Sequence, residues 1–562
     1  MQKKESVLVV FGEEMPKGDL SQYDIVLSGG ELKKFIEPGS IYEASAFAEE
    51  LSHVKLQDGT RLVKSFTYEG YELWWLYYNS LFTYFGLPYT QYKKLLTYLK
   101  NFHHVTFYKP PFKSLFSYYL EAHGSTINIL REPGFKTSAL LPFGILLQIF
   151  ITLLSVPILM FKKQRLMVFI GDKFEKSQDY DARMKFIYQE LRQRKVPFVE
   201  FIRSLESWKM ILEHVFIRKR PVIYSEAVAF LGKFLAVFSD KPRFSVPEQD
   251  PESKFQFLVA THYLQTVYND IWAMRIMKWI LWVISIRAGL FTAALDRNFH
   301  AVFGCKLNNI PTVGILHGVA SRYYNGYDFL PGFDGEKSIA LDKYGVWSEW
   351  WKEYYVKNSK AYKPEQLFVS GPMRPLQPQT GDSGRVRSSN RQKINVLLVS
   401  EIIAVPTEVL PYLNALMNVE DFSVYIKFRA NRDSFETWLK SNHPEILSKF
   451  SEDRILKGSM QEAIALCDVA VGSQSTGVIE ATLQQKPFVL FNTKKWGDYY
   501  SMTESDKTRQ FFAKNPQELI EKIRDVQSVS LDTLKALREQ YFGDPHKNGS
   551  KWVVDRIAEL LT

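Results

Sequence analysis

Short apolar runs alternate with amphipathic stretches along most of the chain, as strands and helices do when they follow one another. In residues 1–135, the runs that predict strands lie at 6–11, 24–28, 61–66, 105–109 and 126–130. Helical or irregular stretches separate them. This first region is therefore expected to be α/β.

A different pattern follows at 137–163. Residues 137–161 carry no formal charge, and Lys162, Lys163 and Arg165 come directly after them, which meets the length and flank criteria for a membrane helix. Pro142 and Pro157 would kink such a helix. We therefore expect an apolar membrane-associated helix or hairpin at 137–163. A single crossing would separate the first region from the rest, which favours a re-entrant or interfacial helical hairpin. A core hairpin buried between two domains is the alternative.

Two further α/β regions are predicted after this segment. Strand-like runs at 166–170, 198–202, 222–224, 290–295 and 312–316 indicate a doubly wound parallel sheet, the first Rossmann-like domain, over residues 166–371. Residues 372–393 are rich in Pro, Gly, Ser and Arg and form a linker. Runs at 394–400, 424–428, 454–456, 469–471 and 487–491 then predict a second Rossmann-like domain over 394–562, whose closing helices could cross back.

Composition and charge limit the classes of binding partner that we expect. Hydrophobic residues make up 46% of the chain and aromatic residues 15%, which excludes a disordered protein and suggests a membrane interface or stacking sites. The net charge of +10 favours anionic lipid headgroups, phosphorylated substrates or nucleic acid. No finger spacing, RNP-like segment or long basic tract is present, so we expect no nucleic-acid partner. Two distant cysteines, Cys305 and Cys467, favour a reducing cytoplasmic location without structural zinc.

The segment 468–491 is the strongest candidate for a binding site. It predicts a strand, a tight polar turn, a helix over 476–485 and a second strand. Gly472, Ser473, Ser475 and Thr476 in the turn would bind phosphate oxygens at the helix N-terminus. Glu480, one turn further on, would accept hydrogen bonds from a ribose diol. The alternative is that Ser and Thr only cap the helix and that Glu480 is solvated.

His317 is the leading catalytic candidate, because it ends a predicted strand and Gly318 lets the chain turn closely around a ligand. Its imidazole could deprotonate an acceptor hydroxyl or, as a cation, stabilise a leaving phosphate. Asp296 ranks next as a base or as an orienting group, ahead of Glu226 and Asp172. A structural histidine at a strand end is the alternative.

Lys427 and Arg429 end another predicted strand. Alternate residues of a strand point to the same side, so the two cations could neutralise a diphosphate together. A solvated basic strand end is the alternative. The sequence holds no DxD triplet and no His/Asp/Glu spacing typical of a divalent ion, so we expect no metal site.

Taken together, the His317-Gly318 segment, the strand ending at Lys427, and the 472–480 turn with Glu480 resemble the GT-B glycosyltransferase superfamily over residues 166–525. They are most similar to bacterial surface and capsule polysaccharide transferases and to CDP-glycerol glycerophosphotransferases. The Lys427-Phe428-Arg429 segment lacks the second histidine of the Lys-Pro-His-Pro-like segment in the glycerophosphotransferases, which disfavours CDP-glycerol as the donor.

The resemblance implies an α/β fold with two Rossmann-like domains that face a cleft. It also implies a metal-independent enzyme without a cofactor, whose substrate is a nucleotide-activated donor. The sugar or polyol phosphate would pass to a lipid-linked or glycan acceptor at the cytoplasmic face of the inner membrane, in polysaccharide synthesis of the cell envelope. A sugar-nucleotide epimerase or hydrolase on the same fold and an inactive membrane-associated scaffold are the alternatives.

Overall fold

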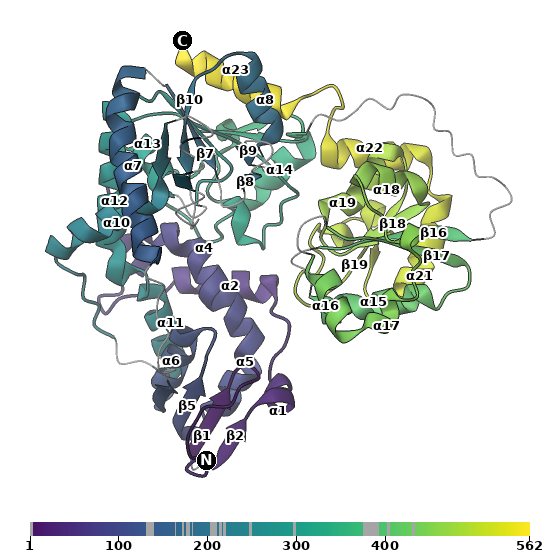
Figure 1. Ribbon diagram of the computed structural model, residues 1–562, viewed down its shortest axis with the longest axis horizontal. Coiled ribbons are helices and arrows are strands. Elements are labelled where there is room, and N and C mark those ends of the chain that lie inside the picture. Colours follow the sequence, from purple (N-terminus) through teal and green to yellow (C-terminus); the bar gives the residue numbers. More distant parts are fainter. Residues whose placement is uncertain are drawn as a thin grey trace.

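Three parallel β-sheets organise the computed structural model (Figure 1). The structure describes residues 4–130, 140–162, 165–170, 174–175, 180–181, 184–202, 211–212, 216, 221–246, 250–295, 299–374, 393–401, 405–429 and 433–562. The two larger sheets are Rossmann-like, as the apolar runs predict, and the first region has a smaller parallel sheet of its own.

The N-terminal sheet has the order β2-β1-β5-β6, and all its neighbouring strands are parallel. Its strands are β1 (Lys4–Val10), β2 (Ile25–Leu27), β5 (Phe102–Tyr108) and β6 (Thr126–Leu130), and its helices are α1 (Gly29–Lys33), α2 (Ile41–Ser52), α5 (Leu87–Leu99) and α6 (Lys113–Ala122). The strand predicted at 61–66 is wrong, because these residues form the short helix α3 (Leu62–Ser65). Leu62 and Val63 are both fully buried, which suits a helical turn better than a strand that alternates sides.

Residues 67–86 connect α3 to α5. They form a small hairpin of β3 (Thr67–Tyr68) and β4 (Tyr71–Glu72), followed by η1 (Leu73–Tyr77), α4 (Tyr78–Leu81) and η2 (Phe82–Gly86). Trp74 and Trp75 are fully buried in this segment, so its aromatic residues serve as core.

The first Rossmann-like sheet has the order β11-β10-β7-β12-β13-β14-β15. All its pairs are parallel, and the strands are β7 (Leu166–Ile170), β10 (Phe198–Ile202), β11 (Val222–Tyr224), β12 (Ala288–Phe291), β13 (Thr312–Ile315), β14 (Lys343–Val346) and β15 (Leu367–Val369). The order in which the chain adds strands reverses between β7 and β12: β10 and β11 lie on one side of β7, and β12 to β15 lie on the other. This is the switch point where such sheets bind ligands. The run predicted at 290–295 overshoots β12, and β14 and β15 were missed because neither has a long apolar run.

The helices of this domain surround the sheet, except the helix at 251–261, which packs against α6 and α2 of the N-terminal region (Figure 1). They are α7 (Leu140–Lys162), α8 (Lys185–Gln193), α10 (Ser225–Leu235) with η3 (Ala236–Phe238), α11 (Pro251–Thr261), α12 (Val267–Val283), α13 (Phe299–Lys306) and α14 (Glu349–Asn358), and a hairpin pairs β8 (Phe174–Glu175) with β9 (Tyr180–Asp181).

The described part of the apolar segment, residues 140–162, is a single helix, so of the predicted helix or hairpin the structure has the helix and not the favoured hairpin. Helix α7 runs without a break from Leu140 to Lys162. Pro142 falls in its first turn, where a missing N–H costs no hydrogen bond, and Pro157 is accommodated inside the helix. By length and composition alone, α7 could cross a membrane.

The second Rossmann-like sheet has the order β17-β16-β18-β19-β20, again with parallel pairs. Its strands are β16 (Ile394–Val399), β17 (Phe422–Lys427), β18 (Val469–Gly472), β19 (Phe488–Phe491) and β20 (Phe512–Ala513), and its helices are α15 (Pro406–Met417), α16 (Ser434–Asn442), α17 (Pro444–Leu447), α18 (Met460–Leu466), α19 (Thr476–Ile479), α20 (Asp506–Arg509), α21 (Pro516–Asp525) and α22 (Leu531–Phe542). The run at 454–456 forms only an isolated bridge from Ile455 to Ile426, because a 3-10 turn, Glu452–Arg454, precedes it.

The last helix, α23 (Gly549–Leu561), leaves the second sheet and packs on the first (Figure 1). Val553, Val554 and Ile557 on α23 share a buried cluster with Val313 and Ile315 of β13. The domain that sequence analysis assigns to 394–562 thus ends on the other sheet.

Candidate active site between the two Rossmann-like sheets

The switch point of the second sheet lies between β16 and β18, and the polar turn follows β18 there. Gly472 is the last residue of β18, and the packing there leaves no room for a side chain. A Cβ atom at this position would lie 2.6 Å from Val478 Cγ2 and 3.1 Å from the Val399 carbonyl oxygen. Ser475 caps the following helix, and its hydroxyl accepts a hydrogen bond from Gly477 N over 3.1 Å. The helix cap that the alternative reading requires is therefore present at Ser475.

The helix after this turn is shorter than expected. Only Thr476–Ile479 are α-helical, and a 3-10 segment, η8 (Glu480–Gln484), continues from them. A short α-helix has a weak dipole, so any phosphate contact here rests on hydroxyl groups and individual N–H groups. Gln474 adds to these donors. Its side chain is buried, and its Nε2 has no hydrogen-bond partner among the residues that the structure describes.

The His317 loop meets this turn from the first sheet. Val319 N donates to Thr476 Oγ1 over 3.4 Å, a contact between residues 157 positions apart in the chain. His317 itself is half-buried, and its ring stacks on Tyr327 at a centroid distance of 5.4 Å. Leu316 O accepts from Trp347 Nε1 over 2.6 Å, which holds the loop on its other side. The structure thus brings the catalytic candidate and the hydroxyl-rich turn to one place.

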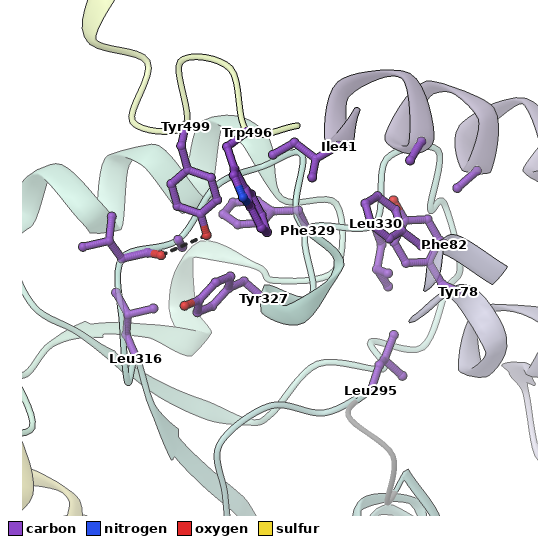
Figure 2. Packing of buried hydrophobic residues seen from close by; sticks show 14 of the residues in the cluster. Ile41, Tyr78, Phe82, Leu295, Leu316, Tyr327, Phe329, Leu330, Trp496 and Tyr499 are labelled. Atoms are coloured by element: carbon purple, nitrogen blue, oxygen red, sulfur yellow. Dashed lines mark hydrogen bonds between the residues drawn. The ribbon is translucent and has the colours of Figure 1, made fainter. Parts of the chain in front are cut away.

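The aromatic loop at 492–502, after β19, closes the contact between the sheets. Tyr499 OH donates to Val319 O over 3.2 Å, and Tyr500 OH donates to Gln474 O over 3.0 Å. Figure 2 shows Tyr499 and Trp496 beside Tyr327, with the Tyr499 hydrogen bond drawn. The loop therefore holds the His317 loop and the β18 turn together. No residue of this loop was among the predicted site residues, although the aromatic run just beyond β19 was a usable signal for it.

Glu480 is half-buried beside the turn. Its Oε2 accepts from Gln461 Nε2 over 3.0 Å and lies 3.9 Å from Arg374 Nη1. Burial raises the pKa of Glu480, and the nearby Arg374 guanidinium opposes part of that rise. The alternative reading required a fully solvated carboxylate, which Glu480 is not. A carboxyl pKa raised by burial beside a polar turn is typical of functional sites.

Glu401 is a site residue that sequence analysis missed. It follows β16 at the switch point, where burial raises its pKa and the Ser475 hydroxyl and Arg429 lower it in part. Its neighbour Ser400 donates to Asp433 Oδ1 over 2.9 Å. Asp433 also accepts from Arg429 N over 3.0 Å and so ties the ends of β16 and β17 together. The position of Glu401 directly after a predicted strand was the available signal.

The two cations of β17 are placed differently from each other. The buried Lys427 ammonium donates to Gly458 O over 2.7 Å and to Leu456 O over 3.3 Å, and burial lowers its pKa. It therefore holds the loop that leads into α18. Arg429 is exposed, and its charge acts on Glu401. Of the pair, only Arg429 is open to a ligand.

Of the remaining acidic candidates, the structure places only Glu226, and it lies away from this site. Asp296 and Asp172 lie outside the described residues. Glu226 follows β11, four strands from β13, and at about 4.8 Å per strand it is about 19 Å away. Within the described part of the chain, no three His, Cys, Asp or Glu side chains are grouped as metal ligands would be. Metal independence stays a prediction.

The sequence matches no protein-family model, and it has no significant match among curated proteins. Several solved structures align with it at low similarity. A co-structure of S. aureus MnaA with UDP has 14% identity and a TM-score of 0.37, and the alignment covers 71% of this chain and 97% of that one. The glycotransferase of kitacinnamycin has 13% identity and a TM-score of 0.42, with 70% and 98% covered. UDP-GlcNAc 2-epimerase from Neisseria meningitidis, bound to UDP-GlcNAc, has 13% identity and a TM-score of 0.39, with 70% and 99% covered.

Proposed function

We propose that the protein is a GT-B-type glycosyltransferase. It moves a sugar or a polyol phosphate from a nucleotide-activated donor to a lipid-linked or glycan acceptor in cell-surface polysaccharide synthesis. The observation that carries the proposal is the hydrogen bond from Val319 N to Thr476 Oγ1. It sets the end of β13, with His317, against the hydroxyl-rich turn at the switch point of the second sheet, where parallel sheets bind nucleotides.

The second sheet would hold the donor. The hydroxyls of Ser473, Ser475 and Thr476 and the buried Gln474 Nε2 gather at one strand end and would donate to phosphate oxygens. The Ser473 hydroxyl donates to Gln474 Oε1 in this structure, so it would exchange that hydrogen bond for one to phosphate. Arg429 is exposed at the neighbouring strand end and would neutralise part of the diphosphate charge. Lys427 would position the loop before α18 and would not contact the diphosphate, because its ammonium already donates to two backbone carbonyls.

Glu480 would bind the ribose of the donor. A carboxylate repels phosphate but accepts hydrogen bonds from a diol, and burial strengthens those bonds by lowering the local dielectric. Glu401 lies nearer the Ser475 hydroxyl and Arg429. It would orient these two groups rather than contact the sugar.

His317 would act as the general base. With a sugar donor, its imidazole takes the proton of the acceptor hydroxyl while that oxygen forms a bond to the anomeric carbon. The bond from the anomeric carbon to the diphosphate breaks, and the nucleoside diphosphate leaves with the electron pair. Tyr327 stacks on the imidazole and would keep the ring in position. The step requires neither a metal nor a cofactor.

The acceptor class and the location are part of the same proposal. A lipid-linked acceptor would bring the protein to the cytoplasmic face of the inner membrane. The net charge of +10 supports attraction to that surface, where anionic headgroups are common.

Nucleotide binding gives the first test. Isothermal titration with UDP, GDP, CMP, CDP and their sugar conjugates is expected to show one preferred base, and Glu480→Gln should weaken binding at least about tenfold, or about 1.4 kcal/mol. Glu462→Gln on the adjacent α18 is the matched control, because Glu462 caps its own helix and should leave affinity unchanged. No binding of any nucleotide would favour an inactive scaffold and contradict the proposal.

Turnover separates the transferase from its alternative. His317→Ala is expected to keep donor affinity and to lose about 10²- to 10⁴-fold in transfer rate, the usual contribution of a general base. Donor consumption should require an acceptor, such as undecaprenyl-linked oligosaccharide. Interconversion or hydrolysis of the donor without any acceptor, at an unchanged rate when acceptor is added, would instead identify an epimerase or hydrolase.

A further inference from the structure

Helix α7 buries polar side chains and exposes apolar ones, the reverse of the usual arrangement in a water-soluble domain. The side that faces the protein carries three buried polar residues, Gln148, Thr152 and Ser155, beside Val156 and Leu159. The exposed side is wholly apolar and comprises Phe143, Leu146, Phe150, Leu153, Leu154, Ile158 and Phe161. These positions recur three or four residues apart, so they form one stripe along the helix. A helix of a water-soluble domain normally buries its apolar side.

The inner side of α7 is bound to the domain. Thr152 is 1% exposed, and its Oγ1 accepts from Tyr224 N, at the end of β11, over 3.1 Å. The helix also packs against α10. Withdrawing α7 into a bilayer would break this hydrogen bond and carry Gln148, Thr152 and Ser155 into hydrocarbon, where unpaired polar groups are costly. The helix is therefore a fixed part of the first Rossmann-like domain.

Two neighbouring helices extend the exposed stripe into a broad surface (Figure 1). Helix α10 packs between α7 and α12, and a Cβ atom at Gly232 would lie only 2.6 Å from Asn269 O of α12. The outer sides of these helices expose Phe230 and Phe234 on α10, Val237 and Phe238 on η3, and Trp279 and Trp282 on α12. Phe238 is 81% exposed and Trp282 is 71% exposed. We call the outer stripe of α7 and these six residues the apolar face.

Charge around the apolar face has one predominant sign. Residues 140–162 contain no Asp or Glu, and the exposed Lys162 and Lys233 end α7 and α10. On α12, Asp270 is already bound by Tyr77 OH at 2.6 Å and His300 Nε2 at 2.8 Å. The Trp pair near the end of α12 suits the depth of lipid headgroups, where indole rings gather.

A pocket borders the apolar face just beyond Phe238. It has a volume of about 330 Å³ and is lined in part by Lys241, Arg243, Phe244, Val246, Phe257 and Leu258. Lys241 is three residues from Phe238, so the pocket begins within about 11 Å along the chain. Its two exposed cations above apolar side chains suit an anionic headgroup with part of its acyl chain, although Asp240 stands beside them.

We infer that the apolar face is a membrane-binding surface, which lies in the plane of a bilayer that contains anionic lipid. Helix α7, about 34 Å long from its 23 residues, lies parallel to the membrane and buries its outer stripe in the acyl-chain boundary. The surrounding cations contact the headgroups. The protein binds one leaflet and does not cross the bilayer. This inference stands apart from the proposed transfer reaction, because it uses none of the residues at the donor site.

Vesicle co-sedimentation of the full chain tests the surface. Wild type should bind vesicles of 70% phosphatidylcholine and 30% phosphatidylglycerol, and more weakly pure phosphatidylcholine. Phe234→Glu with Phe238→Glu, and separately Phe150→Glu with Leu154→Glu, should each reduce binding at least about tenfold, because two apolar side chains are lost from the interface. These side chains are exposed, so folding and nucleotide affinity should not change.

The matched control is Leu466→Glu with Leu531→Glu, two exposed apolar residues of the second Rossmann-like domain. It should bind vesicles as wild type does. Equal binding by all variants would overturn the inference. Light scattering gives a second way to overturn it. If wild type is a dimer, if the apolar-face variants are monomers and if vesicle binding is unchanged, then a second copy of the chain covers the apolar face and not a membrane.

Cysteine labelling distinguishes an in-plane helix from a crossing one. Cys305 and Cys467 are both buried, so single cysteines can be introduced as Met15→Cys in the N-terminal region and Leu531→Cys in the second Rossmann-like domain. In membranes of intact orientation, a membrane-impermeant maleimide should label both positions from the same side. Labelling from opposite sides would mean that α7 crosses the bilayer, and the inference would fail.

Discussion

At the scale of single residues, the candidate site holds two carboxyl groups in surroundings that disfavour their charge. Burial is the main cause at both Glu480 and Glu401, and the nearby guanidinium groups compensate only in part. Such an arrangement reduces stability and is retained where a charge serves binding or catalysis. Ser475 illustrates the opposite case, because its hydroxyl caps α19 whether or not a ligand is present.

The raised pKa of Glu480 predicts a pH-dependent stability effect. The folded state holds this proton more tightly than the unfolded state, whose pKa is near 4.5, so the group lowers stability as pH rises above 4.5. Glu480→Gln resembles the protonated form at every pH. Its melting temperature should therefore match wild type near pH 4 relative to a common baseline and exceed it increasingly as pH rises from 4.5 through the raised pKa of the folded state, as measured by calorimetry.

Glu462→Gln is the control for this effect, because hydrogen bonds from Ser459 lower the pKa of Glu462. Its stabilising contribution is present above pH 4.5 and is lost as pH falls through the lowered pKa. The difference between Glu462→Gln and wild type should stay constant from pH 5 to 7. A Glu480→Gln difference that is equally flat would contradict the assigned environment.

At the scale of elements, the ends of β16 and β18 are packed so closely that only glycine fits at the last position of β18. A Cβ atom at Gly472 would meet Val478 of α19 and the carbonyl of Val399 in β16. The close contact sets where the polar turn leaves the sheet. It therefore couples strand packing to the placement of Ser473, Ser475 and Thr476.

Gly472→Ala should accordingly destabilise the protein by about 1 to 3 kcal/mol, the usual cost of forcing an atom into a packed site. It should also weaken donor binding, since the turn must shift. Urea unfolding measures the first effect and titration the second. Gly30→Ala is the control, because it lies in helix α1, no atom approaches within 4 Å, and alanine favours helix. Equal stability of Gly472→Ala and wild type would contradict this packing.

At the scale of the whole molecule, the chain links its domains more than once. After the second sheet it returns through α23 to the first, and the 492–502 loop contacts both the His317 loop and the N-terminal region. In the latter contact, Ile41 N donates to Lys495 O over 3.0 Å. Tyr42 also packs on Tyr323, which follows the His317 loop in the chain. The position of His317 relative to the polar turn after β18 thus depends on all three sheets.

Because α23 packs on the first Rossmann-like sheet, a substitution that disrupts α23 should destabilise that sheet and not the second one. Val554 is fully buried against the first sheet, so Val554→Asp should cost at least about 3 kcal/mol by placing a charge in an apolar core. Hydrogen exchange should accelerate in β12, β13 and β14 and remain unchanged in β16 and β18. Lys551→Ala on the exposed side of α23 should change neither. Faster exchange confined to the second sheet would contradict the packing of α23.

Much of the fold could be predicted from local pattern. The runs at 166–170, 198–202 and 222–224 coincide with strands because buried parallel strands need mostly apolar residues. The run at 126–130 coincides with β6, a partly exposed strand at the edge of the N-terminal sheet. The pattern failed at 61–66, 454–456 and β14, where tertiary packing outweighed local preference. In the site, the cap at Ser475 was readable, whereas Glu401, Gln474 and the 492–502 loop depend on which strands lie adjacent.

By itself, the sequence determined the α/β class, the division into regions and the polar turn after β18, because apolar period and capping chemistry act over a few residues. Only the tertiary structure decided that Val319 meets Thr476, that Lys427 is occupied by backbone carbonyls while Arg429 is exposed, and that α7 turns its polar side inward. These outcomes depend on strand order and on contacts between residues far apart in the chain. No local pattern records them.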